Sequence, residues 1–147
     1  TVVLCNDMAV DVLPITAAVC SACLPGLEIF SERIAAQIRD AWEDGSEIDW
    51  QSLGLPADTA LMKTVHARVI ARTYAITRFY QLCDPDIRRL RHRFRIVHDS
   101  GKCAAHSWFG DGVHDIQTLT VDRMPPFVDC ECDYCLCDLV ALADWET

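Results

Sequence analysis

Apolar residues recur at helical spacing in two long stretches of the chain. In residues 26–43 they stand three or four positions apart and the pattern ends at Gly45; the stripe is Leu27, Phe30, Ile34, Ile38 and Ala41. A second stripe follows Asp58, a residue type that caps helices, and consists of Leu61, Val65, Val69, Ile76 and Tyr80. Because a period of 3.6 residues places such positions on one face, we predict amphipathic helices over 26–43 and 57–82.

A third helix is predicted over residues 85–98. Asp84 is a suitable cap, and Pro85 stands at the first helical position, where its missing N–H costs nothing. The apolar stripe is narrow and consists of Ile87, Leu90, Phe94 and Val97. The positions between are almost all basic: Arg88, Arg89, Arg91, His92, Arg93 and Arg95.

The pattern changes beyond Gly101. Apolar and polar residues alternate on either side of a Gly-Asp-Gly turn at 110–112, so a β-hairpin is predicted over 103–122. A cysteine-rich segment follows over 125–147, in which residues 139–145 are expected to form a short helix. With 147 residues and 51% apolar content, the chain can bury one core. The prediction is therefore a single, mostly α domain over 1–147, with three amphipathic helices, a small β-hairpin and a C-terminal segment that a bound zinc ion would stabilise.

Nine cysteines suggest metal ligation, and four of them follow the spacing Cys-x-Cys-x-x-Cys-x-Cys: Cys130, Cys132, Cys135 and Cys137. Cys20 and Cys23 have the Cys-x-x-Cys spacing of half a zinc site and could complete a shell with the C-terminal thiols. A third, mixed set is His98, Cys103, His106 and His114. Structural zinc is the preferred cofactor. Buried reduced thiols that act as small hydrophobic residues and a catalytic or redox thiol remain the alternatives.

The N-terminal sequence shows no pattern of a signal peptide, and no uncharged run approaches the length of a membrane span. An intracellular protein is expected, whose cysteines would be reduced or bound to metal rather than paired in disulfides.

Charge is unevenly distributed. The net charge is -9, yet ten of the thirteen Lys and Arg residues lie between Lys63 and Lys102. Three explanations stay open for the arginine-rich segment: a binding face for an acidic partner, docking of the acidic flanks onto it, or a solvated surface. Overall acidity disfavours broad coating of nucleic acid.

Three blocks occur in the order found in a viral family. The first runs from Val12-Leu13-Pro14 through Cys20 and Cys23 to Ile38-Arg39 and Gly45; the second is residues 88–93; the third is residues 103–109, Cys-Ala-Ala-His-Ser-Trp-Phe. Together they resemble the adenoviral early-region-four regulatory proteins encoded by the fourth open reading frame. The third block departs from that family at His106, where the family has arginine.

The resemblance implies a small, non-enzymatic viral regulatory protein that binds a host complex, namely protein phosphatase 2A through its regulatory B subunit, in the host nucleus and cytoplasm. The partner-binding residues it implies are Arg88, Arg89, Arg91, Arg93, His106 and Phe109. Trp108 is added because it and Phe109 would form an aromatic anchor next to the basic helix. The alternative is that Trp108 and Phe109 both belong to the core. No membrane contact is expected.

Two other functions are weighed against this adaptor. A zinc-stabilised regulator could contact nucleic-acid phosphates through the basic helix 85–98. A Cys/His hydrolase could use Cys103 with His106 or His114. A zinc deaminase is disfavoured, because neither His66 nor His114 stands in a His-x-Glu motif.

Overall fold

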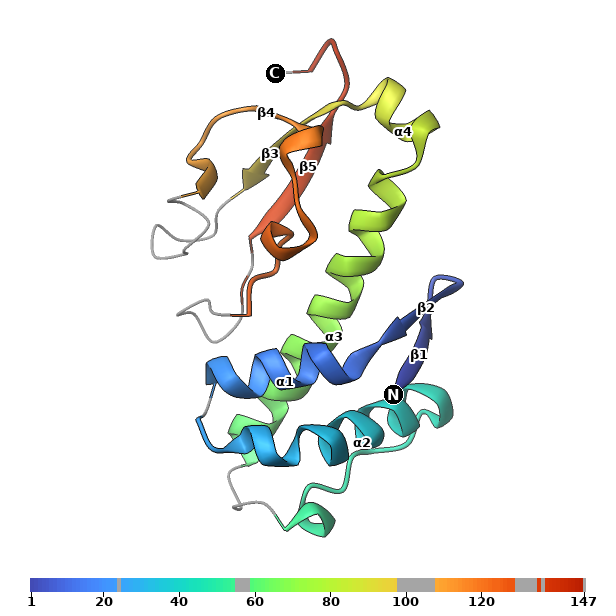
Figure 1. Cartoon of the computed structure of the whole chain (residues 1–147), viewed down its shortest axis with the longest axis vertical. Coiled ribbons are helices and arrows are strands. Elements are labelled where there is room, and N and C mark those ends of the chain that lie inside the picture. The colour runs from blue at the N-terminus through green and yellow to red at the C-terminus, as the bar shows by residue number, and fades with distance from the viewer. Residues whose placement is uncertain (24, 55–58, 98–107, 129–134, 136, 147) are drawn as a thin grey trace. The chain divides into compact units, whose positions relative to one another are not determined.

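The computed structural model describes residues 1–23, 25–54, 59–97, 108–128, 135 and 137–146 (Figure 1). The chain divides into two compact units, an N-terminal unit of Thr1–Thr73 and a C-terminal unit of Tyr74–Thr147. About 57% of the described structure is helical, and it includes two small antiparallel sheets, so the mostly α class is confirmed.

The N-terminal unit begins with a β-hairpin that the sequence analysis missed. Strands β1 (Val2–Cys5) and β2 (Met8–Asp11) pair antiparallel, with Val3 opposite Val10. The connecting residues Asn6 and Asp7 both have positive φ, as a two-residue hairpin turn requires, and these residue types tolerate that conformation well. Helix α1 (Val12–Cys23) follows directly, and its first turn is capped by the Asp11 carboxylate, which accepts from the Leu13 N–H at 3.0 Å.

The two long predicted helices are present. A short 3₁₀ turn, Leu27–Phe30, leads into α2 (Ser31–Asp44), which ends at Gly45 in the left-handed conformation. After a second 3₁₀ turn, Gln51–Leu53, comes α3 (Thr59–Leu82). The N-terminal unit buries Ile34 and Ile38 of the first stripe and Val65 and Val69 of the second, whereas Tyr80, at the far end of the second stripe, is 51% exposed.

The predicted helix 85–98 is wrong beyond its first turn and a half. Helix α4 spans only Pro85–Leu90, capped as expected by Asp84, which accepts from the Asp86 N–H at 2.8 Å. The chain then becomes strand β3 (Arg93–Val97), in which Phe94 and Ile96 are buried and their neighbours face outward. Period-two burial therefore prevails over the helical stripe, because Ile96 lies off that stripe and could not reach the core from a helix.

The predicted hairpin 103–122 is replaced, over its described part, by different elements. Strand β4 (His114–Asp115) pairs with β3, and two 3₁₀ turns follow at Ile116–Thr118 and Val121–Arg123. Asp115 caps the first of these by accepting from the Gln117 N–H at 2.9 Å, which ends the strand after two residues. Residues 103–107 lie outside the described residues.

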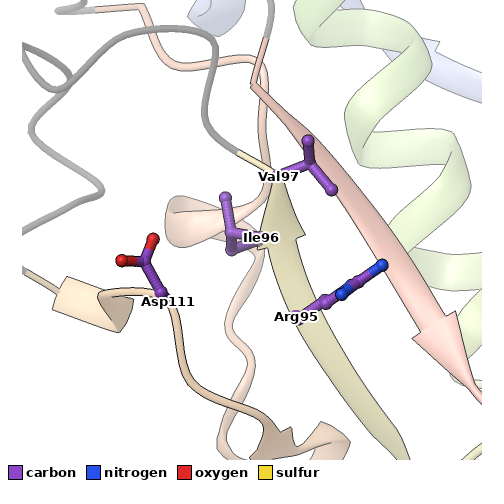
Figure 2. A pocket seen from close by; sticks show the side chains of 4 residues that line it. All are labelled: Arg95, Ile96, Val97 and Asp111. Carbon is purple, nitrogen blue, oxygen red and sulfur yellow. The ribbon is translucent and has the colours of Figure 1, made fainter. Parts of the chain in front are cut away.

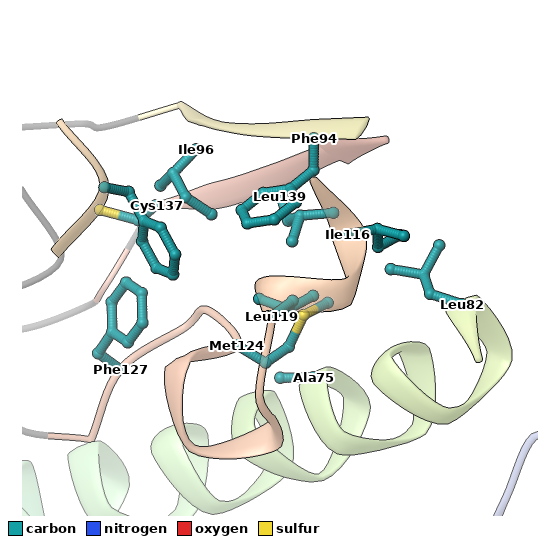
Figure 3. Close-up of a cluster of buried hydrophobic side chains, with 11 residues drawn as sticks. Ala75, Leu82, Phe94, Ile96, Ile116, Leu119, Met124, Phe127, Cys137 and Leu139 are labelled. Atoms are coloured by element: carbon teal, nitrogen blue, oxygen red, sulfur yellow. The ribbon is translucent and has the colours of Figure 1, made fainter. Parts of the chain in front are cut away.

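The expected terminal helix 139–145 is also wrong, since strand β5 (Asp138–Leu142) occupies its place and pairs antiparallel with β3. The sheet order is β4-β3-β5. Leu139 and Leu142 are buried, and the sheet covers an apolar cluster together with α3 and the 3₁₀ turns (Figure 3). The buried members of the cluster are Ala75, Leu82, Phe94, Ile96, Phe109, Ile116, Leu119, Met124, Phe127, Cys137 and Leu139.

Candidate functional site

Helix α4 exposes apolar side chains beside a cation. None of its residues is buried; the side chain of Arg89 is 75% exposed, and Leu90 is 61% exposed. Trp145 is also exposed, at 80%, in the segment after β5, and its neighbour Glu146 pairs at 3.4 Å with Arg91, the residue that follows Leu90. We call Ile87, Arg89, Leu90 and Trp145 the α4 surface. Exposed aromatic, aliphatic and arginine side chains are the residue types that protein interfaces use most.

Other arginines of the predicted binding face serve the fold instead. Arg91 donates to the Ala141 carbonyl at 3.0 Å, and Arg93 donates to the carbonyls of Ala143, Asp144 and Glu146, each at 3.1 Å. His92 Nε2 lies 3.0 Å from the Asp144 carboxylate. The acidic C-terminal residues therefore dock on the arginine-rich segment, which was one of the three explanations left open by the sequence.

These contacts close the free edge of β5. Residues Leu139, Ala141 and Ala143 alternate along the chain, so their backbone groups face away from β3. Arg78 caps the Leu139 carbonyl at 2.7 Å, and Glu146 accepts from the Ala143 N–H at 3.1 Å. Side chains thus satisfy backbone N–H and carbonyl groups that could otherwise pair with another strand.

Arg88 is also engaged within the fold. Its Nε donates to the Leu82 carbonyl at 3.0 Å, and one terminal nitrogen lies 3.3 Å from the Cys83 sulfur. Of the arginines predicted to bind a partner, Arg89 has the most exposed contact, a 3.9 Å approach to Asp86.

The aromatic pair of the third block divides between core and surface. Phe109 is 8% exposed and meets Phe94 edge-on at 5.5 Å, so it belongs to the core rather than to a binding face. Trp108 is 36% exposed; its ring meets Phe127 edge-on at 5.5 Å, and the Arg123 guanidinium lies 5.3 Å from its ring centre. His106 lies outside the described residues.

The candidate zinc ligands are only partly described. His98, Cys103, His106, Cys130 and Cys132 lie outside the described residues. Within the described ranges no three Cys, His, Asp or Glu side chains gather as a metal shell would require. Cys137 is buried in the apolar cluster, with Cys135 packed against it, and the His114 Nε2 bonds the Phe109 carbonyl at 2.7 Å. The Cys137 and His114 environments are those of packed core side chains, as in the alternative of buried reduced thiols.

Cys20 and Cys23 lie together at the end of α1 in the N-terminal unit. Burial raises the pKa of the Cys20 thiol, and the nearby Ser31 hydroxyl partly opposes that rise. Arg68 of α3 approaches the Cys23 sulfur at 3.4 Å.

No protein-family model, curated protein or solved structure matches this chain. In the described part of the chain, no helix combines the length and apolar character needed to cross a bilayer.

An open pocket of about 300 Å³ lies beside β3 (Figure 2). Arg95 and Asp111 contribute opposite charges to it, and Ile96 and Val97 supply apolar walls. The described part of its lining holds no thiol or imidazole.

The exposed apolar members of the α4 surface were missed at the sequence level. Ile87 and Leu90 fall on the stripe assigned to the core, and Trp145 was assigned to a terminal helix. The sequence does contain a signal for this: the alternation of polar and apolar residues from Arg93 to Ile96 predicts a strand. If the helix ends before that strand, Leu90 no longer shares a helical stripe with Phe94.

Proposed function

We propose that this chain is a small, non-enzymatic adaptor that binds an acidic and apolar surface of a host protein through the α4 surface. The expected partner is the regulatory B subunit of protein phosphatase 2A, as the resemblance of the three sequence blocks implies. The observation that carries the proposal is the exposure of the apolar Leu90 and Trp145 together with that of the cationic Arg89.

The chemistry of this patch suits a protein more than a nucleic acid. A phosphate backbone calls for several cations in a row, whereas Arg91 and Arg93 already bond the chain's own carbonyls. Leu90 and Trp145 would gain from burial against apolar side chains, and Arg89 would pair with a carboxylate at the rim of that contact. The proposed binding site therefore keeps Arg89, adds Ile87, Leu90 and Trp145, and leaves Phe109 to the core.

Binding of the purified B subunit to the intact chain, measured by calorimetry at physiological salt, tests the proposal. Arg89→Glu combined with Trp145→Ala is expected to weaken binding about 30-fold or more, because the pair removes a cation and an aromatic anchor. Arg33→Glu is the matched control, since it makes the same charge change at an exposed position of the N-terminal unit.

Equal affinity of the intact chain and the α4 double variant would refute the assigned surface. A lack of measurable binding by the intact chain would refute the assigned partner. Steeply salt-dependent, sequence-indifferent binding to duplex DNA would favour the nucleic-acid alternative instead.

A further inference from the structure

Cys20 and Cys23 are placed as a disulfide-forming pair requires. Both lie on α1 within the N-terminal unit, and both are reduced in the structure. Positions i and i+3 of a helix share a face, with Cβ atoms about 5–6 Å apart. A disulfide brings Cβ atoms to about 3.5–4.5 Å, so a small adjustment at the end of the helix suffices. Cys23 is the last residue of α1, where such an adjustment breaks few helical hydrogen bonds.

The two thiols differ in accessibility and in their neighbours. Cys20 is 0% exposed, whereas Cys23 is half-buried and reachable from solvent. The Arg68 guanidinium lies 3.4 Å from the Cys23 sulfur. A guanidinium at this distance can stabilise the negative charge of an attacking thiolate. The exposed sulfur therefore suits first attack, and the buried one suits the second, resolving step.

We propose that Cys20 and Cys23 form a redox-active dithiol, which a low-molecular-weight disulfide such as oxidised glutathione converts to an intramolecular disulfide. The Cys23 thiolate attacks one sulfur of glutathione disulfide, forms a mixed disulfide and releases one glutathione. Cys20 then loses its proton, attacks the Cys23 sulfur and releases the second glutathione. The two cysteines lose two electrons and two protons in total, and the glutathione disulfide gains them. This activity is separate from the adaptor function and does not depend on it.

Cys83 provides a control within the same chain. Its sulfur lies 3.3 Å from the Arg88 guanidinium, and it is half-buried like Cys23. No other cysteine lies within three positions of Cys83 in the sequence. Cys83 therefore shares the arginine contact of Cys23 but lacks a resolving thiol at Cys-x-x-Cys spacing, so its reaction should stop at the mixed disulfide.

The experiment exposes the full chain, in its native state, to oxidised glutathione, quenches with acid, alkylates free thiols and identifies tryptic peptides by mass spectrometry. A Cys5→Ser background is used, because cleavage after Arg33 leaves Cys5, Cys20 and Cys23 in one peptide. Peptide 1–33 is expected to lose two hydrogens and to carry no glutathione. Peptide 79–88, which contains Cys83, is expected to carry one glutathione.

Variants assign the two roles. Cys20→Ala should trap glutathione on Cys23, and Cys23→Ser should leave Cys20 unmodified because it is buried. Arg68→Met should slow the reaction of Cys23 several-fold while the rate at Cys83 stays unchanged. Circular dichroism checks that each variant folds, and the result for the Cys5→Ser parent with both Cys20 and Cys23 present tests the proposal even if a further variant does not fold. A stable glutathione adduct on Cys23 in the intact pair, or no reaction there while Cys83 reacts, would overturn the proposal.

Discussion

Helix α4 and strand β3 are neighbours in the chain and alike in composition, yet they differ in nearly every structural property. Helix α4 buries none of its residues, while β3 buries Phe94 and Ile96 in the core of the C-terminal unit. Arg89 on the helix lies 3.9 Å from Asp86, whereas Arg93 on the strand bonds three carbonyls. Arginine and apolar residues therefore form an exposed surface on α4. On β3 the apolar residues are buried in the core, and Arg93 bonds backbone carbonyls.

This difference shows that the role of an arginine depends on whether backbone carbonyls without a donor lie within its reach. The edge of β5 presents carbonyls that require donors, and the arginines within reach of that edge bond them. The Arg89 side chain is 75% exposed and lies 3.9 Å from the Asp86 carboxylate. Four predictions test this contrast, in order of decreasing effect on stability.

Phe94→Ala should cause the largest loss, about 3–5 kcal/mol of unfolding free energy, because it empties the centre of the apolar cluster. Leu90→Ala, only four residues earlier, should change stability by less than about 0.5 kcal/mol, because Leu90 is already in solvent. Urea unfolding followed by circular dichroism measures both. Similar losses for the two variants would show that α4 packs against the chain after all.

Arg93→Met should cost about 1–3 kcal/mol, since the carbonyls of Asp144 and Glu146 lose the guanidinium donor while the apolar stem is retained. The Ala143 carbonyl keeps the Glu146 N–H as a donor. Arg89→Met is the matched control and should stay within about 0.5 kcal/mol of the wild-type protein. The same unfolding assay applies. Equal losses of unfolding free energy for the two variants would contradict the contrast between a structural Arg93 on the strand and an exposed Arg89 on the helix.

Asp84→Ala should cost about 1 kcal/mol, because the Asp86 N–H loses its capping acceptor at the start of α4. Asp84→Asn serves as the control, since asparagine also caps helices well. Because α4 presents the proposed binding patch, we also expect weaker partner binding by the alanine variant. A cap variant as stable as the wild-type protein would mean that α4 is held by other contacts.

The Arg91–Glu146 pair should contribute least, with a coupling energy below about 1 kcal/mol in a double-mutant cycle, because both side chains are partly in solvent. Arg91→Gln, Glu146→Gln and the double variant complete the cycle. The coupling should shrink further in high salt. A coupling of several kcal/mol that is independent of salt would place this pair in a buried environment instead.

Local patterns predicted much of the N-terminal unit and less of the C-terminal unit. The stripes of α2 and α3 are long, and Gly45 ends α2 as expected, so periodicity alone was sufficient there. The N-terminal hairpin was missed although Asn6-Asp7 is a recognisable turn pair between apolar residues. In the C-terminal unit the elements are short, and each pattern of four or five residues fits more than one structure.

The sequence by itself determined the long amphipathic helices, the Asp84–Pro85 start of α4 and the clustering of positive charge, because these depend on residues close together in the chain. Only the tertiary structure decided that Arg93–Val97 is a strand, that Arg78 and Arg91 bond carbonyls at the β5 edge, and that Phe109 is core while Leu90 is surface. The physical reason is that these outcomes depend on partners that lie far away along the chain, whose backbone groups and apolar surfaces must be satisfied together.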